Sequence, residues 1–117
     1  MDNQYKIYYY NGIVASIYDG DTIRVDVDLG FNNWVKNMKL RLYGIDTPEI
    51  RGNEREMGLL AKQFVEDRIP IGTQIQILTV KDQTGKYGRY LAKIFYGDGI
   101  NLNQELIDSG NAKTYTP

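Results

Sequence analysis

Acidic side chains stand at two turn signals in this sequence, and their positions could hold a metal ion. Asp21 follows the turn dipeptide Asp19-Gly20 and opens residues 21–29, where apolar and polar side chains alternate as in a half-buried strand. This alternation points Asp21 toward the apolar face, where an unpaired carboxylate is costly. A bound cation would offset that cost, although an ordinary Asp-Gly turn also explains these residues.

The second acidic segment runs from a strand into a proline turn. Pro48 restricts Thr47 to an extended conformation, which places Asp46, the Thr47 carbonyl and Glu49 around one bend. Asp46 lies an even number of residues from Leu40 and Leu42 in the strand expected at residues 38–45. Because alternate residues of a strand point to the same face, we expect Asp46 on the face of these leucines. Two Asp carboxylates, a carbonyl and water are ligands that suit Ca²⁺. Helix capping with a simple ion pair would account for the segment equally well.

A third segment, Lys86-Tyr87-Gly88-Arg89, places basic and aromatic side chains at the end of a polar loop. Such a cluster can hold a phosphate and stack a base, and arginine can bind two phosphate oxygens at once. Alone, the segment is more typical of a solvated hairpin loop. With Arg41 and the acids it suits phosphodiester hydrolysis, which needs a base for the attacking water and cations for the phosphoryl charge.

The composition narrows this chemistry further. The 117 residues contain neither Cys nor His, which excludes disulfides and thiolate nucleophiles and argues against zinc. A general base at neutral pH must therefore be a carboxylate, Lys, Tyr or metal-bound hydroxide. A metal would be a hard cation held by oxygen. The net charge of −1 argues mildly against a nucleic-acid partner, although a basic cleft can lie on an acidic body.

Length and hydropathy predict the broad class. A chain of 117 residues favours a single domain over residues 1–117, and a monomer is the expected state. No apolar run reaches membrane-spanning length, and the first residues lack the basic and apolar regions of a signal peptide. We therefore expect no membrane partner and a cytoplasmic location, with a secreted or phage-encoded origin left open.

Turn signals and alternation predict the strands. Asn11-Gly12 is a tight-turn signal between two of them, and Phe31 and Trp34 lie in a hairpin tip expected at residues 30–37. Strands are expected at residues 5–10, 13–18, 21–29, 38–45, 73–80 and 89–96.

Helical periodicity predicts two helices. A helix is expected over residues 53–68, where Asn53 and Glu56 fit a capping box. A short helix is expected over residues 103–109, with Gly110 as its stop. This order of elements favours an α+β, β-rich fold in which helices cap a small barrel, an architecture that binds oligonucleotides on one face. The apolar face of the longer helix is expected to comprise Met57, Leu60, Ala61, Phe64 and Val65.

The three segments together resemble the signature segments of the staphylococcal nuclease (thermonuclease) family in order and approximate spacing. The resemblance covers roughly residues 13–113. It implies an OB-fold five-stranded barrel with two or three packed helices. It also implies a Ca²⁺-dependent nuclease that cleaves DNA and RNA, preferably single-stranded, to products with 3′-phosphate ends.

The resemblance implies a division of labour among the acids. Asp21, Asp46 and the Thr47 main-chain carbonyl would hold Ca²⁺. Glu49 would be the general base that activates the attacking water. Asp19 is expected to support the turn rather than to bind the metal directly.

The resemblance assigns the remaining residues to the substrate. Arg41 and Arg89 would bind the phosphate and stabilise the transition state. Lys86 and Tyr87 would contact the terminal phosphate of the nucleotide, and Tyr115 is the candidate for stacking on a base.

A rival hypothesis is a non-catalytic module that binds nucleic acid or protein. The same fold occurs in repeated domains that have lost catalytic residues. Here all five catalytic and metal-binding side chains are present, which favours the enzyme: Asp21, Arg41, Asp46, Glu49 and Arg89. Because the chain is slightly acidic, we expect substrate binding to be weak and steeply dependent on salt.

Overall fold

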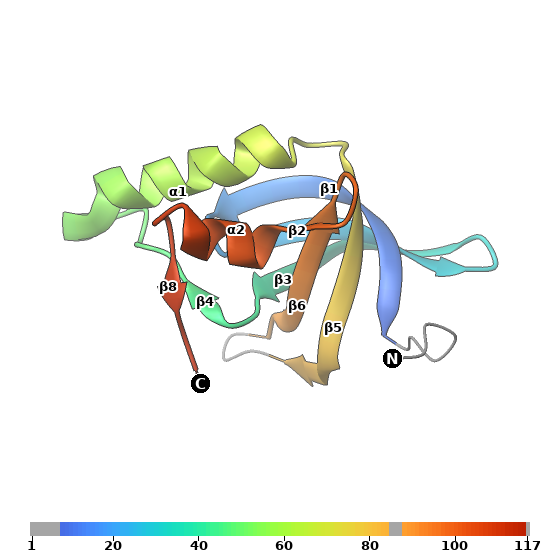
Figure 1. The fold of residues 1–117 in the computed structure, drawn as a ribbon. Helices are drawn as coiled ribbons and strands as arrows, with labels where there is room; N and C mark the ends of the chain where they lie inside the picture. The colour runs from blue at the N-terminus through green and yellow to red at the C-terminus, as the bar shows by residue number, and fades with distance from the viewer. Residues whose placement is uncertain (1–7, 85–87, 117) are drawn as a thin grey trace.

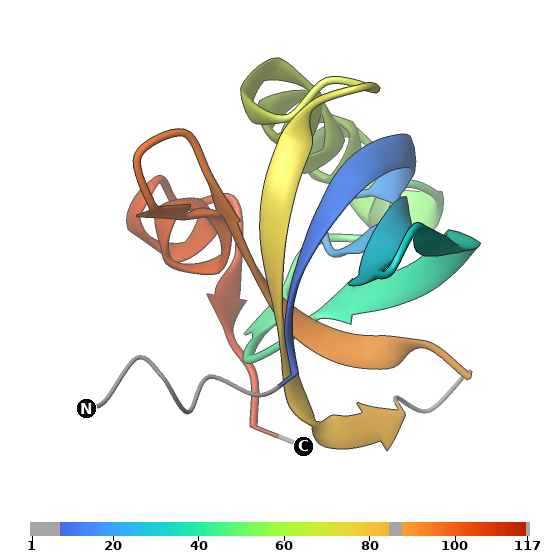
Figure 2. The same ribbon diagram turned by 90° about the vertical axis from the view of Figure 1, so that its right-hand side faces the viewer.

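The strands of the computed structural model, which describes residues 8–84 and 88–116, curl into a closed barrel (Figures 1 and 2). The order along the sheet is β3 (Asn33–Leu42), β2 (Thr22–Gly30), β1 (Tyr9–Asp19), β5 (Gln74–Thr84) and β6 (Tyr90–Tyr96). Neighbours in this order pair antiparallel, and a parallel pairing of β3 with β6 closes the barrel. The predicted five-stranded OB-fold barrel is confirmed.

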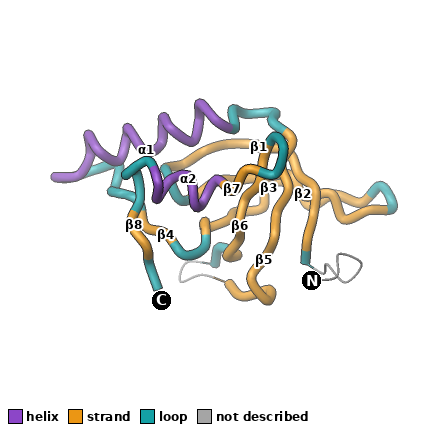
Figure 3. Tube along the Cα trace, viewed as in Figure 1, coloured by secondary structure: helices purple, strands orange, loops and turns teal. Residues whose placement is uncertain are grey.

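Two α-helices pack on this barrel, as predicted (Figures 1 and 3). They are α1 (Arg55–Arg68), preceded by the 3₁₀ turn η2 (Gly52–Glu54), and α2 (Leu102–Asp108). Gly110, with φ +82°, follows α2 as expected for a helix stop. Neither helix in the described part is long and apolar enough to cross a membrane. The short strands are β4 (Ile45–Asp46), which pairs with β8 (Lys113–Thr114), and β7 (Ile100–Asn101), which pairs with β6.

The core fills the barrel interior and the space beneath the helices. Its members are almost entirely aliphatic, as the alternation of the strands predicts. Buried core side chains include Val14, Ile23, Val25, Leu40, Leu42, Ile45, Val65, Ile69, Ile75, Ile77, Ile94, Leu102 and Leu106.

The predicted contact face of α1 was partly wrong. Met57 and Leu60 are 60% and 66% exposed, and the buried residues of the helix are Gly58, Ala61 and Val65. Gly58 lies against the backbone of Pro48 and Glu49, and Ala61 lies against Gly20 of the β1–β2 turn. Only a narrow stripe of the helix is therefore covered. The periodicity of apolar residues does not single out Gly58, although Gly58 is one of the buried residues of the helix.

The predicted capping box at Asn53 was also wrong. The helix begins at Arg55, and its N-cap residue Glu54 makes no side-chain capping bond. The Glu54 carboxylate instead accepts a hydrogen bond from the backbone N–H of Glu49 at 3.0 Å. The start of α1 is therefore tied to the proline turn rather than capped by its own first turn.

The predicted turn at Asn11-Gly12 was wrong, because both residues lie within β1. Gly12 pairs with β2 on one side and with β5 on the other. A Cβ at this position would lie 2.7 Å from the Ile77 side chain and 3.0 Å from the Asp26 carbonyl oxygen. Close packing of strands, rather than a chain reversal, requires glycine here.

The β2–β3 hairpin extends past the barrel, on the right in Figure 1. Its tip is shorter than predicted, because pairing resumes at Gly30 and Asn33. Only Phe31 and Asn32 form the turn, both with positive φ (54° and 63°), as in a two-residue type I′ turn.

Candidate active site

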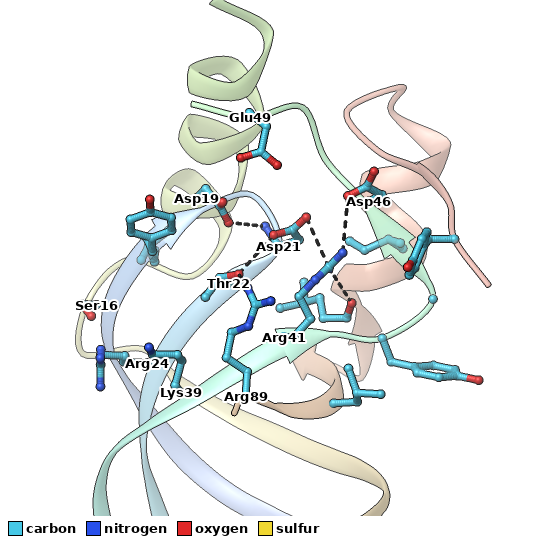
Figure 4. Close-up of a pocket in the computed structure, with 18 of the residues that line it drawn as sticks. Ser16, Asp19, Asp21, Thr22, Arg24, Lys39, Arg41, Asp46, Glu49 and Arg89 are labelled. Atoms are coloured by element: carbon cyan, nitrogen blue, oxygen red, sulfur yellow. Dashed lines mark hydrogen bonds and ion pairs between the residues drawn. The ribbon is translucent and has the colours of Figure 1, made fainter. Parts of the chain in front are cut away.

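An open cleft of about 1360 Å³ brings most of the predicted site residues together. Asp21 comes from the β1–β2 turn, Arg41 from β3, and Asp46 and Glu49 from the segment that leads to α1 (Figure 4). Lys86 and Tyr87 lie outside the described residues. The predicted residues that line the cleft are Asp19, Asp21, Arg41, Asp46, Glu49, Arg89 and Tyr115.

Arg41 lies between the two carboxylates predicted to bind metal. Its Nη1 is 3.3 Å from Asp21 Oδ2, and its Nη2 is 3.4 Å from Asp46 Oδ1. Nη1 also donates to the carbonyl oxygen of Leu42 at 3.2 Å. These contacts hold the guanidinium in one orientation. Two of its nitrogens face the carboxylates of Asp21 and Asp46.

The backbone fixes Asp21 at this position. Its carbonyl accepts a hydrogen bond from the Leu42 N–H at 2.8 Å, and its Oδ2 accepts one from the Thr47 N–H at 3.1 Å. The residue is 6% exposed, as the strand parity predicted. Asp21 therefore joins the β1–β2 turn, the end of β3 and the proline turn.

The parity argument for Asp46 was wrong. Gly44, with φ +80°, turns the chain after β3, so the alternation does not continue. Ile45 is buried, whereas the Asp46 side chain is 39% exposed and lines the cleft. The turn frees this carboxylate to reach a ligand.

Asp19 supports the turn through a hydrogen bond. Its Oδ1 accepts a hydrogen bond from the backbone N–H of Asp21 at 3.0 Å. Burial, followed by the negative charge of Asp21, raises the pKa of Asp19 to about 7. Near neutral pH the Asp19 carboxylate is therefore only partly ionised, so Asp19 and Asp21 together carry less than two negative charges.

Glu49 is exposed, and its carboxylate points into the cleft (Figure 4). Its backbone packs against α1 so closely that a Cβ at Gly58 would clash with the Glu49 carbonyl. The Glu54 carboxylate holds the Glu49 N–H. The side chain is thus free to meet a solvent molecule while its backbone is fixed.

Arg89 joins the network through a residue to which the sequence assigned no role. Its Nη1 donates to Thr22 Oγ1 at 3.0 Å, and the Thr22 hydroxyl donates to Asp21 Oδ1 at 3.2 Å. The parallel register of β3 and β6 puts Leu91, two residues after Arg89, beside Arg41. Closure of the barrel therefore places both arginines at the same carboxylate.

Further cleft residues were missed by the sequence argument. Arg24 and Lys39 pair across β2 and β3 on the polar face, a position that the alternation of residues 21–29 could have indicated. Arg51 Nη2 donates to the hydroxyl of Tyr18 at 2.9 Å at the rim. With Arg41 and Arg89, these cations bring five basic side chains to a cleft that four acidic side chains also line.

Tyr115 closes the side of the cleft near Arg41. Its backbone N–H donates to the Gly44 carbonyl at 2.9 Å, next to the β4–β8 pairing. The Arg41 Cζ lies 6.0 Å from the centre of the Tyr115 ring. The ring is 48% exposed and thus able to meet a ligand.

The donors near Asp21 fit a hard cation. Asp21 and Asp46 offer carboxylate oxygens at the cleft. Thr47, which would supply its carbonyl, lies beside Asp21 through its backbone N–H, but it is 5% exposed and does not line the cleft. Within residues 8–84 and 88–116, no three acidic side chains gather closely enough to hold a metal by themselves. A cation here would complete its coordination with the carbonyl and with water, as Ca²⁺ does.

Comparison with known proteins agrees with this fold. The family model described as staphylococcal nuclease homologue matches residues 39–117. The uncharacterized protein MJ1439 of Methanocaldococcus jannaschii is 35% identical, covering 92% of this chain and 60% of that protein. Endonuclease YhcR of Bacillus subtilis is 28% identical, covering 91% of this chain but 9% of that protein. A thermonuclease of Staphylococcus hyicus is 32% identical, covering 89% of this chain and 60% of that protein.

A closed five-stranded barrel with two packed helices defines an OB-fold protein, which here carries an acid–arginine cleft. The chain belongs to the staphylococcal nuclease homologue family. It spans about 60% of the M. jannaschii and S. hyicus relatives and a small part of YhcR.

Proposed function

We propose that this chain is a Ca²⁺-dependent nuclease that hydrolyses phosphodiester bonds in DNA and RNA, with a preference for single strands. One observation carries the proposal: two arginines converge on Asp21 in an open cleft into which the Glu49 carboxylate points. Relatives named as endonucleases and as a thermonuclease support it.

The arginines would bind the phosphate. Arg41 and Arg89 each carry planar donors that can bind two phosphate oxygens. Asp21 orients Arg41 directly and Arg89 through the Thr22 hydroxyl. Cations fixed in advance stabilise the charge that grows on the phosphoryl oxygens without having to reorganise.

Glu49 would act as the general base. Its carboxylate takes a proton from a water molecule as the water oxygen attacks phosphorus. The bond between phosphorus and the 5′-oxygen breaks as the water oxygen bonds to phosphorus. The 5′-oxygen takes a proton from solvent water and leaves as a hydroxyl, and Glu49 later returns its proton to solvent. The products would carry a 3′-phosphate and a 5′-hydroxyl.

Asp21, Asp46 and the Thr47 carbonyl would hold Ca²⁺. When bound, the cation supplies positive charge that stabilises the phosphoryl oxygens. Arg41 lies within ion-pair distance of both carboxylates, so the same acids would serve the cation and the phosphate-binding arginine.

An exposed aromatic ring in the cleft supports a single-stranded substrate. The exposed Tyr115 ring beside Arg41 offers a surface on which an unpaired base can stack, and stacking of this kind is tolerant of sequence. Contacts from Lys86 and Tyr87 to a terminal phosphate stay predictions.

A digest of single-stranded DNA, run with Ca²⁺ and with chelator at mildly alkaline pH, tests the proposal. Cleavage that requires Ca²⁺ is the expected result. Oligonucleotide binding without cleavage under either condition would instead favour a non-catalytic binding module.

A further inference from the structure

The β2–β3 hairpin carries one face of the cleft outward to an aromatic tip. Arg24 and Lys39 are directly opposed in the two strands and line the cleft, and farther out Asp28 is opposed to Trp34. Opposed residues of an antiparallel pair lie on the same side of the sheet. A β-bulge interrupts the pairing between Val25 and Val27. The face of the hairpin that lines the cleft continues to the tip only if this bulge does not turn the later side chains to the other face.

The inward-facing residues show that the bulge leaves the faces unchanged. Val25 opposes Met38 before the bulge, and Val27 opposes Val35 after it. Val27, Val35 and Met38 line the same small apolar cavity inside the barrel mouth. Trp34, on the opposite side of the strand from Val35, thus shares the outer face with Arg24 and Lys39.

The acids on this face have partners within the hairpin. Asp26 accepts a hydrogen bond from the backbone N–H of Asn37 at 3.0 Å and lies 3.7 Å from Lys36 Nζ. The Asp28 carboxylate accepts a hydrogen bond from the Gly30 N–H at 2.8 Å. Arg24 Nη1 donates to the carbonyl oxygen of Asn37 at 3.1 Å, a bond to a neutral group that does not cancel its positive charge. The charges of Arg24 and Lys39 can therefore act on a ligand that extends from the cleft.

The tip presents aromatic surface to solvent at a conformational cost. Phe31 is 99% exposed and has a φ of +54°, in a region that disfavours bulky side chains and in a turn that usually carries Asn or Gly. Trp34 is 39% exposed, with Lys36 Nζ 5.4 Å from its ring centre. Phe31 adds nothing to the core, so packing does not account for its presence.

We infer that the hairpin is a second subsite for single-stranded nucleic acid, on which Trp34 and Phe31 stack bases of the strand held in the cleft. Arg24 and Lys39 contact the phosphates between the two regions. Basic side chains that follow the backbone, together with aromatic rings on which bases stack, are what binding of a single strand without sequence preference needs. The inference rests on the proposed function only for the identity of the ligand in the cleft.

Trp34 is the only tryptophan in the chain, so its fluorescence reports on the hairpin alone. An oligothymidylate of about ten nucleotides, within the site size of an OB fold, is titrated into the protein in the presence of chelator, which prevents turnover. We expect saturable quenching of the Trp34 emission. Anisotropy of the same oligonucleotide, carrying a fluorescent label, measures binding independently.

Phe31→Ala keeps the probe and removes one stacking surface. It is expected to weaken binding by about 5- to 150-fold, the loss measured for one stacked base. Ile71→Ala is the matched control, because Ile71 is 71% exposed and lies outside the cleft and the hairpin. This control is expected to bind like the unchanged protein.

Three results would overturn the inference. The first is binding by anisotropy without a change in Trp34 emission, and the second is no binding at all. The third is self-association, seen by sedimentation, that Phe31→Ala abolishes while oligonucleotide affinity is unchanged. The Ca²⁺ digest tests the nuclease proposal separately, because cleavage can occur whether or not the hairpin contacts the strand.

Discussion

Arg41 Nη1 lies 3.3 Å from Asp21 Oδ2, with the two side chains only 14% and 9% exposed. A carboxylate this well covered is costly without a cation nearby. The same guanidinium is a proposed phosphate ligand, so the ion pair connects the stability of the fold with the chemistry of the cleft.

Replacing Arg41 should therefore affect both properties. Arg41→Gln is expected to lower kcat by about 10²–10³-fold through lost charge stabilisation. It should also lower the free energy of unfolding by about 3 kcal/mol or less, because the cleft is open to water on one side. Steady-state kinetics and urea unfolding measure the two effects. Arg55→Gln, at the exposed start of α1, is the control, and equal behaviour of the two variants would refute the role of Arg41.

Glu49 should matter for turnover alone. Its carboxylate is exposed and makes no core contact, so Glu49→Gln is expected to leave the thermal midpoint nearly unchanged. Loss of a general base should lower kcat by about 10²–10⁴-fold. Glu56→Gln, also exposed at the start of α1, is the matched control. Near-full activity of Glu49→Gln would rule out the assignment of the base.

Gly58→Ala tests the packing that positions Glu49. In a helix, alanine is normally favoured over glycine by about 1 kcal/mol. Here a Cβ would clash with the carbonyl oxygens of Pro48 and Glu49, so we expect lower stability and lower kcat. Met57→Ala, at an exposed neighbouring position, controls for changes on the helix. A more stable Gly58→Ala variant with full activity would show that the close contact is unimportant.

Tyr96 should make the free energy of unfolding depend on pH in the alkaline range. Its hydroxyl donates to Glu105 Oε1 at 2.6 Å, and burial, followed by this bond, raises the pKa of Tyr96 from 10.0 to about 12. Between these values the unfolded chain loses the proton while the folded chain keeps it. The stabilisation is therefore complete below pH 10.0 and is lost as the pH rises toward about 12.

Urea unfolding of Tyr96→Phe across this range measures the effect. The variant should be less stable below pH 10.0 and should lose less stability than the unchanged protein as the pH rises. Tyr8→Phe controls for the loss of a hydroxyl elsewhere. Parallel pH profiles for Tyr96→Phe and the unchanged protein would contradict the assignment.

Local sequence signals predicted turns and strands correctly where neighbouring residues alone determine the backbone conformation. At the Asp19-Gly20 signal the chain does turn, with Gly20 and Asp21 between β1 and β2. Asn11-Gly12, with equal turn propensity, lies inside β1. The difference lies in Ile77 and the Asp26 carbonyl, which are distant in sequence and leave no room for a side chain at Gly12. Turn propensities describe neighbouring residues only, so they do not include contacts between residues that are distant in sequence.

The same limit applies to the site. Asp21 was placed correctly because β2 alternates regularly, whereas the turn at Gly44 ended the alternation before Asp46. The Thr22 hydroxyl, which links Arg89 to Asp21, could not be anticipated because it requires the parallel closure of β3 on β6. The acids and arginines could be named from their motifs, but the bonds among them depend on the barrel.

The most direct measurement is the time course of a single-stranded DNA that carries a fluorescent label on its 5′-end, which phosphatase does not remove, with the purified chain in Ca²⁺ and in chelator. Treating the products with a phosphatase that removes terminal phosphates shows the chemistry of their 3′-ends. We predict cleavage only with Ca²⁺ and products whose mobility changes after phosphatase treatment. Intact DNA under both conditions, or Ca²⁺-dependent products that phosphatase does not alter, would contradict the proposed activity.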